Sequence, residues 1–299
     1  MADLKGILCI NKPQNFTSFD VVAKLRGILG MKRIGHAGTL DPMATGVLPI
    51  FLGTATKACD ILPDNDKTYI AEFKLGLSTD TQDIWGRLIA EKSSDFITGE
   101  AFEDSLEKFR GDIMQIPPMY SAVSVNGKRL YDLARQGIEV EREPRPITVY
   151  ELELLSFNES EKSGSLKISC SKGTYIRTLI NDIAESLDTL GVMTSLVRIK
   201  ASGFKIDNCV TLEKLEKMKE KNESFDNLVL PVEKAFSYYP KLMLFNKQAK
   251  MYKNGVKLDI GRIKDFPNAK DGIVRVYTDG EFSGLARRDN EELRVYKNF

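Results

Sequence analysis

The chain has 299 residues, of which 42% are hydrophobic, 28% charged and 9% aromatic. This is the composition of an ordinary globular protein, so a mainly disordered chain is excluded, and the length allows one large domain or a large one with a small one. The 43 Lys and Arg residues nearly balance the 42 Asp and Glu residues. A polyanionic partner would therefore have to be recognised by local charge.

The first third of the chain predicts strands and helices in turn. The apolar run at residues 6–12 predicts a buried strand that ends at Pro13, because proline has no N–H for the ladder. A Thr-x-x-Asp capping box and apolar residues at helical spacing predict a helix at 17–29, ended by Gly30. A strand, a short helix and an alternating strand are then expected at 47–53, 54–62 and 67–75.

The middle of the chain mixes the two periodicities. A helix is expected around residues 102–109, and an excursion from the core at 117–146, where four prolines and two glycines fall within 30 residues. Helical spacing returns briefly at 130–135. Two strands and an amphipathic helix follow at 148–157, 166–171 and 174–187. Because no regular βαβ rhythm is present, an α+β fold is favoured over a doubly wound sheet.

The last quarter of the chain has a different character. Residues 211–227 predict a solvated amphipathic helix that runs into a linker. From about Tyr239 the pattern is one of short strands and turn pairs, among them Asn254-Gly255 and Asp279-Gly280. This tail is expected to form a small β module.

Basic residues gather in two runs. Residues 241–264 hold seven basic residues and one acid, Asp259, and residues 24–36 hold four basic residues and no acid. One such run is typical of a solvated face. Two runs on a nearly neutral protein, one in each expected domain, favour a phosphate backbone as partner.

Cysteine and histidine usage limits the chemistry. The four cysteines, Cys9, Cys59, Cys170 and Cys209, are too widely spaced for a disulfide framework or a zinc site, and there is one histidine. We therefore expect no metal. The sequence also lacks a long apolar stretch and a signal peptide, which predicts a cytoplasmic protein without membrane contact.

The segment GHAGTLDPMATGVLP at 35–49 is the most punctuated in the chain, and we expect it to be neither ordinary strand nor helix. Pro42 holds the preceding Asp41 in an extended conformation, which makes its carboxylate a candidate catalytic group on a preset loop. Asp41 could equally cap a helical turn that starts at Pro42, and the two interpretations are compatible. His36, five residues earlier, is either structural or part of the same cleft.

Two tyrosines and an arginine are further candidates for the functional site, on the basis of their positions in the predicted elements. Tyr69 lies on the strand at 67–75, while Tyr175 and Arg177 lie in the first helical turn, off its apolar stripe. Such tyrosines usually pack, but a tyrosine can also stack on a base, worth ~1 to 3 kcal/mol. Arg177 is either a surface charge or a partner that favours the charged form of Asp41.

Five segments in this order resemble the bacterial tRNA pseudouridine synthases of the TruB type. GHAGTLDP and KGTYIRTL are the most specific motifs. The segments are GILCINKPQNFTSFDVV at 6–22, KRIGHAGTLDPMATGVLPIFLGTATK at 32–57, KTYIAEFKLGLSTDTQDIWG at 67–86, PPMYSAVSVNGKRLYDLARQGIEVEREPRPITVYEL at 117–152 and SKGTYIRTLINDIAESL at 171–187. The resemblance implies isomerisation of the T-loop uridine at tRNA position 55 to pseudouridine, after base flipping and without a cofactor.

The resemblance also implies roles for individual residues. Asp41 matches the essential aspartate, Tyr69 the stacking tyrosine and Arg177 the arginine that pairs with the aspartate. Around the substrate it implies a second tyrosine, a base-flipping histidine, an apolar wall and a lysine near the site, namely Tyr175, His36, Leu196 and Lys12.

The reaction explains these residue types. The bond from uracil N1 to C1′ breaks, the base turns while bound, and C5 joins C1′, with no redox change. The carboxylate could attack C1′, add to the base or take a sugar proton, and these alternatives stay open. Tyr69 or a water is the candidate base for the C5 proton.

The resemblance implies a division into two RNA-binding parts. Residues 1–235 would form the catalytic domain, with the insertion at about 117–146 acting as a mobile thumb, and 236–299 a PUA-like module at the acceptor stem. The partner would be tRNA, bound by a monomer that requires no other protein. The residues expected on the RNA backbone are Lys32, Arg33, Lys128, Arg129, Arg135, Lys250 and Lys253.

Three other functions were weighed. A guide-RNA-dependent pseudouridine synthase shares the GHAGTLDP-like loop, but the insertion and the small tail favour the stand-alone type. A noncatalytic RNA-binding or RNA-folding factor would be marked by the loss of Asp41 or Arg177, and both are present. A glycosidase acting on free nucleosides would need a second acid nearby, for which Asp80 and Asp83 are the candidates.

Overall fold

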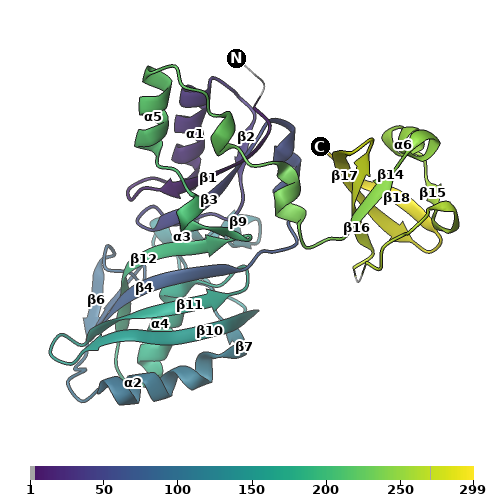
Figure 1. Cartoon of the computed structure of the whole chain (residues 1–299). Coiled ribbons are helices and arrows are strands. Elements are labelled where there is room, and N and C mark those ends of the chain that lie inside the picture. Colours follow the sequence, from purple (N-terminus) through teal and green to yellow (C-terminus); the bar gives the residue numbers. More distant parts are fainter. Residues whose placement is uncertain (1–3, 270) are drawn as a thin grey trace.

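A nine-stranded mixed sheet organises most of the protein in the computed structural model, which describes residues 4–269 and 271–299 (Figure 1). Every pairing is antiparallel except that of β3 with β12. This confirms the α+β fold with a mixed, largely antiparallel sheet. The strand order is β1 (Gly6–Lys12), β3 (Thr45–Leu52), β12 (Gly191–Ala201), β4 (Lys67–Leu75), β11 (Ser163–Cys170), β10 (Arg145–Asn158) and β7 (Gly111–Gln115), with β2 (Ile34–His36) beside β3 and β13 (Phe204–Lys205) beside β12.

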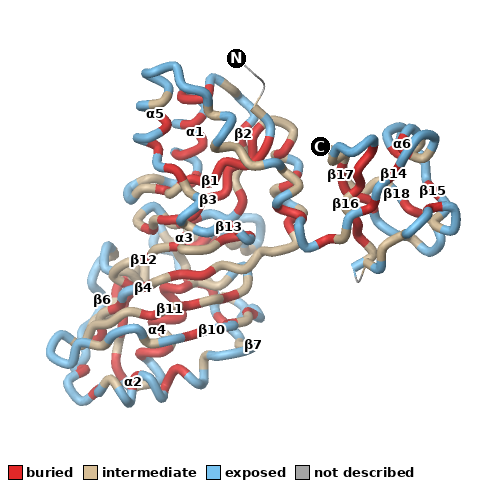
Figure 2. The backbone as a smooth tube through the Cα atoms, in the orientation of Figure 1, coloured by how far each residue is buried: buried red, intermediate tan, exposed pale blue. Residues whose placement is uncertain are grey.

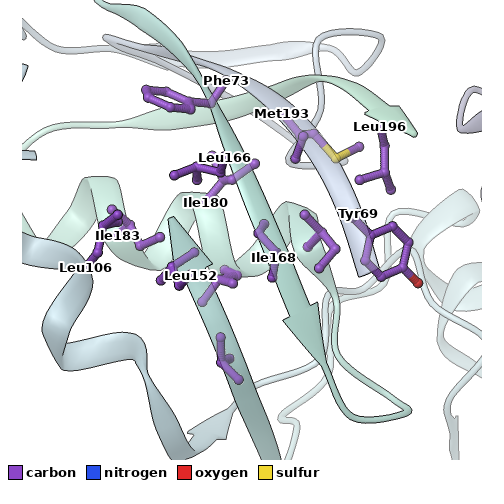
Figure 3. Close-up of a cluster of buried hydrophobic side chains, with 14 of the residues drawn as sticks. Tyr69, Phe73, Leu106, Leu152, Leu166, Ile168, Ile180, Ile183, Met193 and Leu196 are labelled. Carbon is purple, nitrogen blue, oxygen red and sulfur yellow. The ribbon is translucent and has the colours of Figure 1, made fainter. Parts of the chain in front are cut away.

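Helix α4 (Ile176–Ser186) covers one face of β4, β11 and β12 (Figure 1). Its apolar stripe packs on alternate strand residues, so the strands bury one face and leave the other partly polar, as antiparallel sheets often do. Helix α2 (Gly99–Ser105) and the 3₁₀ turn η2 (Leu106–Phe109) close the far end, where the rings of Phe73 and Phe102 stack at 4.4 Å. Tyr69, Met193 and Leu196 lie at the opposite end (Figure 3).

Helix α1 (Ser18–Leu29) packs with α5 (Leu212–Glu220) beside β1 and β3. The predicted capping box is present, because the side chains of Thr17 and Asp20 each accept a hydrogen bond from the backbone N–H of the other residue. Gly30 ends the helix with a left-handed φ of 65°. Short elements connect this region: η1 (Gly53–Ala58), η3 (Ile206–Asn208), η4 (Asp226–Leu228) and η5 (Val232–Phe236). The prediction for 211–227 is confirmed, since α5 takes up Leu212–Glu220 and the rest of the segment forms a connection that leads into η4.

A second sheet of five strands forms from the end of the chain (Figure 1, yellow). Its core is separate from the sheet of the larger part and includes residues of α6 (Asn246–Lys253). One face packs on η1 and η5, and Lys57 Nζ donates to the Asn298 carbonyl at 2.9 Å. The strand order is β14 (Lys241–Leu244), β16 (Ile273–Thr278), β17 (Glu281–Asp289), β18 (Glu292–Asn298) and β15 (Leu258–Asp259), with η6 (Ile260–Arg262) after β15.

Buried residues are concentrated in the strands of the two sheets (Figure 2). Most of α4 is buried as well, together with one face of α1. Small hairpins lie outside them. They are β5 (Leu77–Thr79) with β6 (Leu88–Glu91), and β8 (Ser124–Val125) with β9 (Lys128–Arg129), which leads into α3 (Leu130–Arg135). The helical part of the excursion at 117–146 is thus confirmed. No helix in the described part of the chain is both long and apolar enough to cross a membrane.

Three sequence expectations were wrong. The segment 35–49 is not wholly irregular, since its ends belong to β2 and β3, and only 37–44 is loop. Pro49 lies inside β3 opposite Cys9 of β1, and its carbonyl accepts from the Ala37 N–H at the point where β2 ends. The polar backbone groups of Pro49 therefore face away from β1, and the missing N–H costs no hydrogen bond with that strand. The helix expected at 54–62 is a 3₁₀ turn over Gly53–Ala58. The pair Asn254-Gly255 follows α6 rather than joining two strands.

Candidate active site

A cavity of about 760 Å³ opens where the loop at 37–44 meets α4, β4 and the insertion. It is lined by six of the residues singled out from the sequence, and these are Asp41, Tyr69, Arg135, Tyr175, Arg177 and Leu196. These residues come from distant segments of the chain, since Asp41 and Leu196 are 155 positions apart in the sequence. The tertiary structure therefore gathers the candidates into one site.

The Asp41 carboxylate forms an ion pair with Arg177. Asp41 Oδ2 lies 2.9 Å from Arg177 Nε, and the aspartate side chain is 45% exposed against 6% for the arginine. The expected helix cap would use the Asp41 side chain as the acceptor. In the structure the backbone carbonyl of Asp41 accepts from the Ala44 N–H instead, at 3.1 Å. The carboxylate stays free to face the cavity.

Arg177 is a buried positioning group and not a surface charge. Its Nη1 donates to the Thr81 carbonyl at 2.6 Å and its Nη2 to the Tyr120 carbonyl at 3.1 Å. Asp83 Oδ2 lies 3.9 Å from Nη1. The fixed fork of the guanidinium is thus held on several sides, which fixes the direction of the bond to Asp41.

Beside Tyr69, on the neighbouring strand, lies a second buried arginine that was not predicted from the sequence. Arg198 on β12 is fully buried and donates to the carbonyls of Val47, Thr39 and Gly38 at 2.8, 3.2 and 2.9 Å. Arg198 lies opposite Tyr69 in the register of β12 with β4. Burial raises the pKa of Tyr69 to about 12, so the phenol stays protonated near neutral pH.

The hydroxyl of Tyr69 points away from the packed apolar side chains, while its ring stays beside Leu196 (Figure 3). A flat ring, an aliphatic wall and a fixed carboxylate therefore border the same space. The signal that could have revealed Arg198 is an arginine inside the apolar strand pattern of LVRIKA, because a charged residue at a buried strand position usually has dedicated partners.

Lys12 holds the loop from behind the cavity. Its Nζ donates to the carbonyls of Pro13, Phe16 and Pro42, at 2.9, 2.6 and 3.0 Å. Burial lowers the pKa of Lys12 to about 8, although nearby Asp41 works in the opposite direction. Lys12 thus ties the end of β1 to the turn that carries Asp41.

His36 lies on β2 just before the loop and is not among the residues that line the cavity. Its Nδ1 is buried, and no described residue forms a hydrogen bond with it. Burial, with a smaller effect from Arg198, lowers the pKa of His36. The imidazole is therefore neutral near pH 7 and has an unused polar atom.

The remaining basic candidates are dispersed on the surface. Lys32 and Arg33 precede β2, Lys128 and Arg129 form β9, and all four are exposed. Lys250 and Lys253 are exposed on α6, where Lys253 pairs with Asp279 at 3.0 Å. Arg135 alone among these residues lines the cavity, with its guanidinium 5.5 Å from the ring centre of Tyr131.

Other lining residues were not assigned to the site from the sequence. Two of them are lysines, Lys67 on β4 and Lys172 in the loop before α4. The others are Trp85 and Asp83, an acid that the sequence suggested only for a glycosidase. Burial raises the pKa of Asp83, partly offset by its bond from Thr81 and by Arg177. In residues 4–269 and 271–299, no group of three or more His, Cys, Asp or Glu is placed to hold a metal ion.

Comparisons with known proteins agree with this architecture. Residues 26–176 match the model of the TruB family pseudouridylate synthase N-terminal domain, and residues 177–237 that of the tRNA pseudouridylate synthase B C-terminal domain. The chain is 43% identical to tRNA pseudouridine synthase B of Clostridium tetani, over 98% of this chain and 99% of that protein. It is 44% identical to tRNA pseudouridine synthase B of Geobacillus thermodenitrificans, over 92% of this chain and 91% of that protein.

A solved structure of an H/ACA RNP bound to a substrate RNA containing 2′-deoxyuridine has the same fold. Its matching chain superposes with a TM-score of 0.74 at 24% identity, over 98% of this chain and 84% of that one. The family models, which describe pseudouridylate synthases, give the class of protein to which this fold belongs. The chain belongs to the TruB family of these enzymes, which confirms the resemblance seen in the sequence.

Proposed function

We propose that this protein is a tRNA pseudouridine synthase that converts the T-loop uridine at position 55 to pseudouridine. The observation that carries the proposal is the Asp41–Arg177 ion pair at 2.9 Å on the wall of a cavity that also holds Tyr69. Family membership and near full-length relatives named tRNA pseudouridine synthase B support it. No cofactor enters the reaction that we propose.

Each residue then has a task in the isomerisation. Asp41 acts on the sugar or the base when the N1–C1′ bond breaks, and Arg177 fixes the direction of its carboxylate. The ring of Tyr69 and the side chain of Leu196 keep the detached uracil in place while it turns. With a Tyr69 pKa of about 12, a water fits the acceptor of the C5 proton better than the tyrosine does.

The uridine has to leave its stack to reach Asp41, at a cost of ~a few kcal/mol. We propose that Tyr175 contacts the flipped nucleotide, since it lines the cavity and its backbone is held by two bonds to the Gln115 side chain, at 2.9 and 3.0 Å. His36 would use its unpartnered Nδ1 in the RNA-bound state. Lys12 positions the Asp41 turn.

The RNA-binding surface extends in two directions in this proposal. Residues 1–235 would form the catalytic domain, with 117–146 closing on the T stem-loop through Arg135 and the two basic residues of β9. Residues 236–299 would bind the acceptor stem through α6. We propose a cytoplasmic monomer that needs no partner protein.

The test uses the full chain, an unmodified tRNA transcript and its T stem-loop alone, without added cofactor, with pseudouridine mapped after incubation. We expect conversion at position 55 in both RNAs, and a loss on the order of 10³-fold or more with Asp41→Asn. Conversion in another loop, or full activity of Asp41→Asn, would contradict the proposal.

A second candidate has one observation in its favour. Asp83 is a second acid in the same cavity, and burial raises its pKa, which is the property that a glycosidase requires of its acid. The same incubation distinguishes the two functions, because a glycosidase releases free uracil and leaves an abasic sugar. Release of uracil from RNA or from uridine would favour this second candidate.

A further inference from the structure

Trp85 is the sole tryptophan of the chain, and it lines the catalytic cavity with 41% of its surface exposed. Tryptophan side chains bury large areas in cores and interfaces, so a half-exposed indole on a cavity wall indicates a surface that is covered by something else. Its neighbours Ile84 and Leu88 are also exposed, at 42% and 54%.

The loop that carries Trp85 is held in place. The backbone N–H of Trp85 donates to Asp83 Oδ1 at 3.2 Å, and the backbone N–H of Ile84 donates to the Met193 carbonyl on β12 at 2.9 Å. At Gly86 a Cβ would lie 2.2 and 2.7 Å from two side-chain oxygens of the same loop, so the turn is closely packed. The indole is therefore presented on a preorganised support, which lowers the entropy lost on binding.

This loop also reaches the catalytic pair. Asp83, two residues before Trp85, lies 3.9 Å from Arg177, which pairs with Asp41. The cavity of about 760 Å³ lies in the upper part of the ~300 to 1,000 Å³ range of pockets that enclose whole small ligands. A single flipped uracil beside Asp41 therefore leaves room for a second flat group.

We propose that Trp85 stacks on an unpaired nucleobase of the RNA next to the flipped uridine. The inference rests on the proposed function. An RNA base is favoured over a protein segment because the same cavity is bordered by Arg135 and Lys172, and an aromatic platform beside cationic side chains is the arrangement that binds single-stranded nucleic acid. Stacking of this kind accepts any base, so Trp85 contributes affinity and positioning and does not read sequence.

The first experiment uses the indole as its own probe. Because Trp85 is the sole tryptophan, emission excited at wavelengths that the ten tyrosines do not absorb reports this position alone. The Asp41→Asn variant is titrated with the T stem-loop, and binding is measured independently by the anisotropy of a fluorescein label on the RNA. We expect quenched emission and lower accessibility to acrylamide when RNA binds. RNA binding with unchanged emission and accessibility would overturn the inference.

The second experiment compares Trp85→Leu, which keeps an apolar side chain but removes the flat ring, with Trp85→Phe, which keeps a ring. We expect Trp85→Leu to weaken RNA binding on the order of tenfold and Trp85→Phe to retain most of the affinity. The control is Ile89→Ala, a residue of β6 that is 61% exposed and outside the cavity lining, and it should bind as the parent does. Thermal unfolding verifies that each variant is folded.

The outcomes separate this inference from the proposed function. Normal RNA affinity of Trp85→Leu, the result expected if a protein covers the indole, overturns the role of Trp85 while pseudouridine formation by the parent chain still stands. Equal weakening by Ile89→Ala also overturns it, because the effect would then belong to the whole apolar surface. Absence of pseudouridine with the parent chain defeats the proposed function itself.

Discussion

At the scale of single residues, the site depends on buried cations that hold its loop and its carboxylate. Arg177 and Arg198 bind mainly to carbonyl groups, and Arg177 has one short bond to a carboxylate, that of Asp41. Buried charges are stable only when they are fully hydrogen-bonded. The Asp41 carboxylate is thus oriented by groups that need not react themselves in the proposed function.

Replacing Arg177 should affect turnover more than RNA binding. Arg177→Ala removes the bond that aims Asp41, so we expect kcat to fall on the order of 10² to 10³-fold while RNA affinity changes by less than tenfold. Arg177→Lys, which keeps the charge without the planar fork, should recover part of kcat. Equal losses in kcat and affinity would count against a positioning role.

Lys12 should give the reaction an alkaline limit. Since its pKa is lowered to about 8, the folded protein releases this proton as the pH rises through 8, and a neutral amine has two N–H donors for the three carbonyls that it now serves. The turn at Pro42 then loses a contact, so kcat at saturating RNA should fall above pH 8.

The free energy of unfolding, in contrast to kcat, should rise with pH above pH 8. Between about pH 8 and the ordinary lysine pKa of 10.5, the unfolded chain keeps a proton that the folded chain has released, so this group raises the free energy of unfolding as the pH rises. Lys12→Arg stays charged and should move the decline in kcat to higher pH. A decline that stays near pH 8 in a folded Lys12→Arg variant would exclude Lys12 as its source.

At the scale of elements, one close contact positions the whole catalytic loop. β3 and β12 run parallel, with Arg198 opposite Gly46 in their register. Gly46 has a φ of 104°, and a Cβ there would lie 2.2 Å from the Arg198 carbonyl oxygen. β3, which follows the loop, can therefore approach β12 this closely only because residue 46 is glycine.

Gly46→Ala should therefore destabilise the protein by about 2 to 4 kcal/mol, through both the backbone strain and the contact. Chemical denaturation measures the change. Gly127→Ala is the matched control, since its φ is also positive at 77° but a Cβ there meets nothing within 4 Å. Similar losses at both positions would show that the contact with Arg198 contributes nothing beyond the strain.

At the scale of the whole molecule, the terminal sheet is joined to the larger part by an aromatic contact. The ring of Phe299 lies 5.4 Å from that of Phe236 on η5 and 5.8 Å from that of Phe282 on β17. Lys57 adds a hydrogen bond from η1 to the Asn298 carbonyl. This packing sets the direction in which α6 and its lysines face.

Lys250 and Lys253 test whether this surface binds the acceptor stem. Lys250→Ala should weaken binding of full-length tRNA and lower its salt dependence by about one unit of slope, with no effect on the T stem-loop alone. Lys253→Ala should have a smaller effect, because Lys253 already pairs with Asp279. An equal effect of Lys250→Ala on both RNAs would place this lysine elsewhere on the RNA.

The sequence by itself determined the α+β class, most helices and strands, and Asp41 as the candidate carboxylate. Periodicity, capping boxes and the proline after Asp41 are local signals, and local physical preferences suffice to read them. The motifs also sufficed to indicate the family. The strand predicted at 47–53 is confirmed although it contains Pro49, because strand pairing, and not local preference, decides whether a missing N–H matters.

Only the tertiary structure decided what surrounds the carboxylate. The burial of Arg177, the support from Arg198 and the place of Trp85 on the cavity wall arise from segments that lie far apart in the chain. An arginine on a helix or strand has the same local pattern whether it faces water or a carboxylate. Its partners, its burial and hence its chemistry depend on which segments the fold brings together, and local sequence does not contain that information.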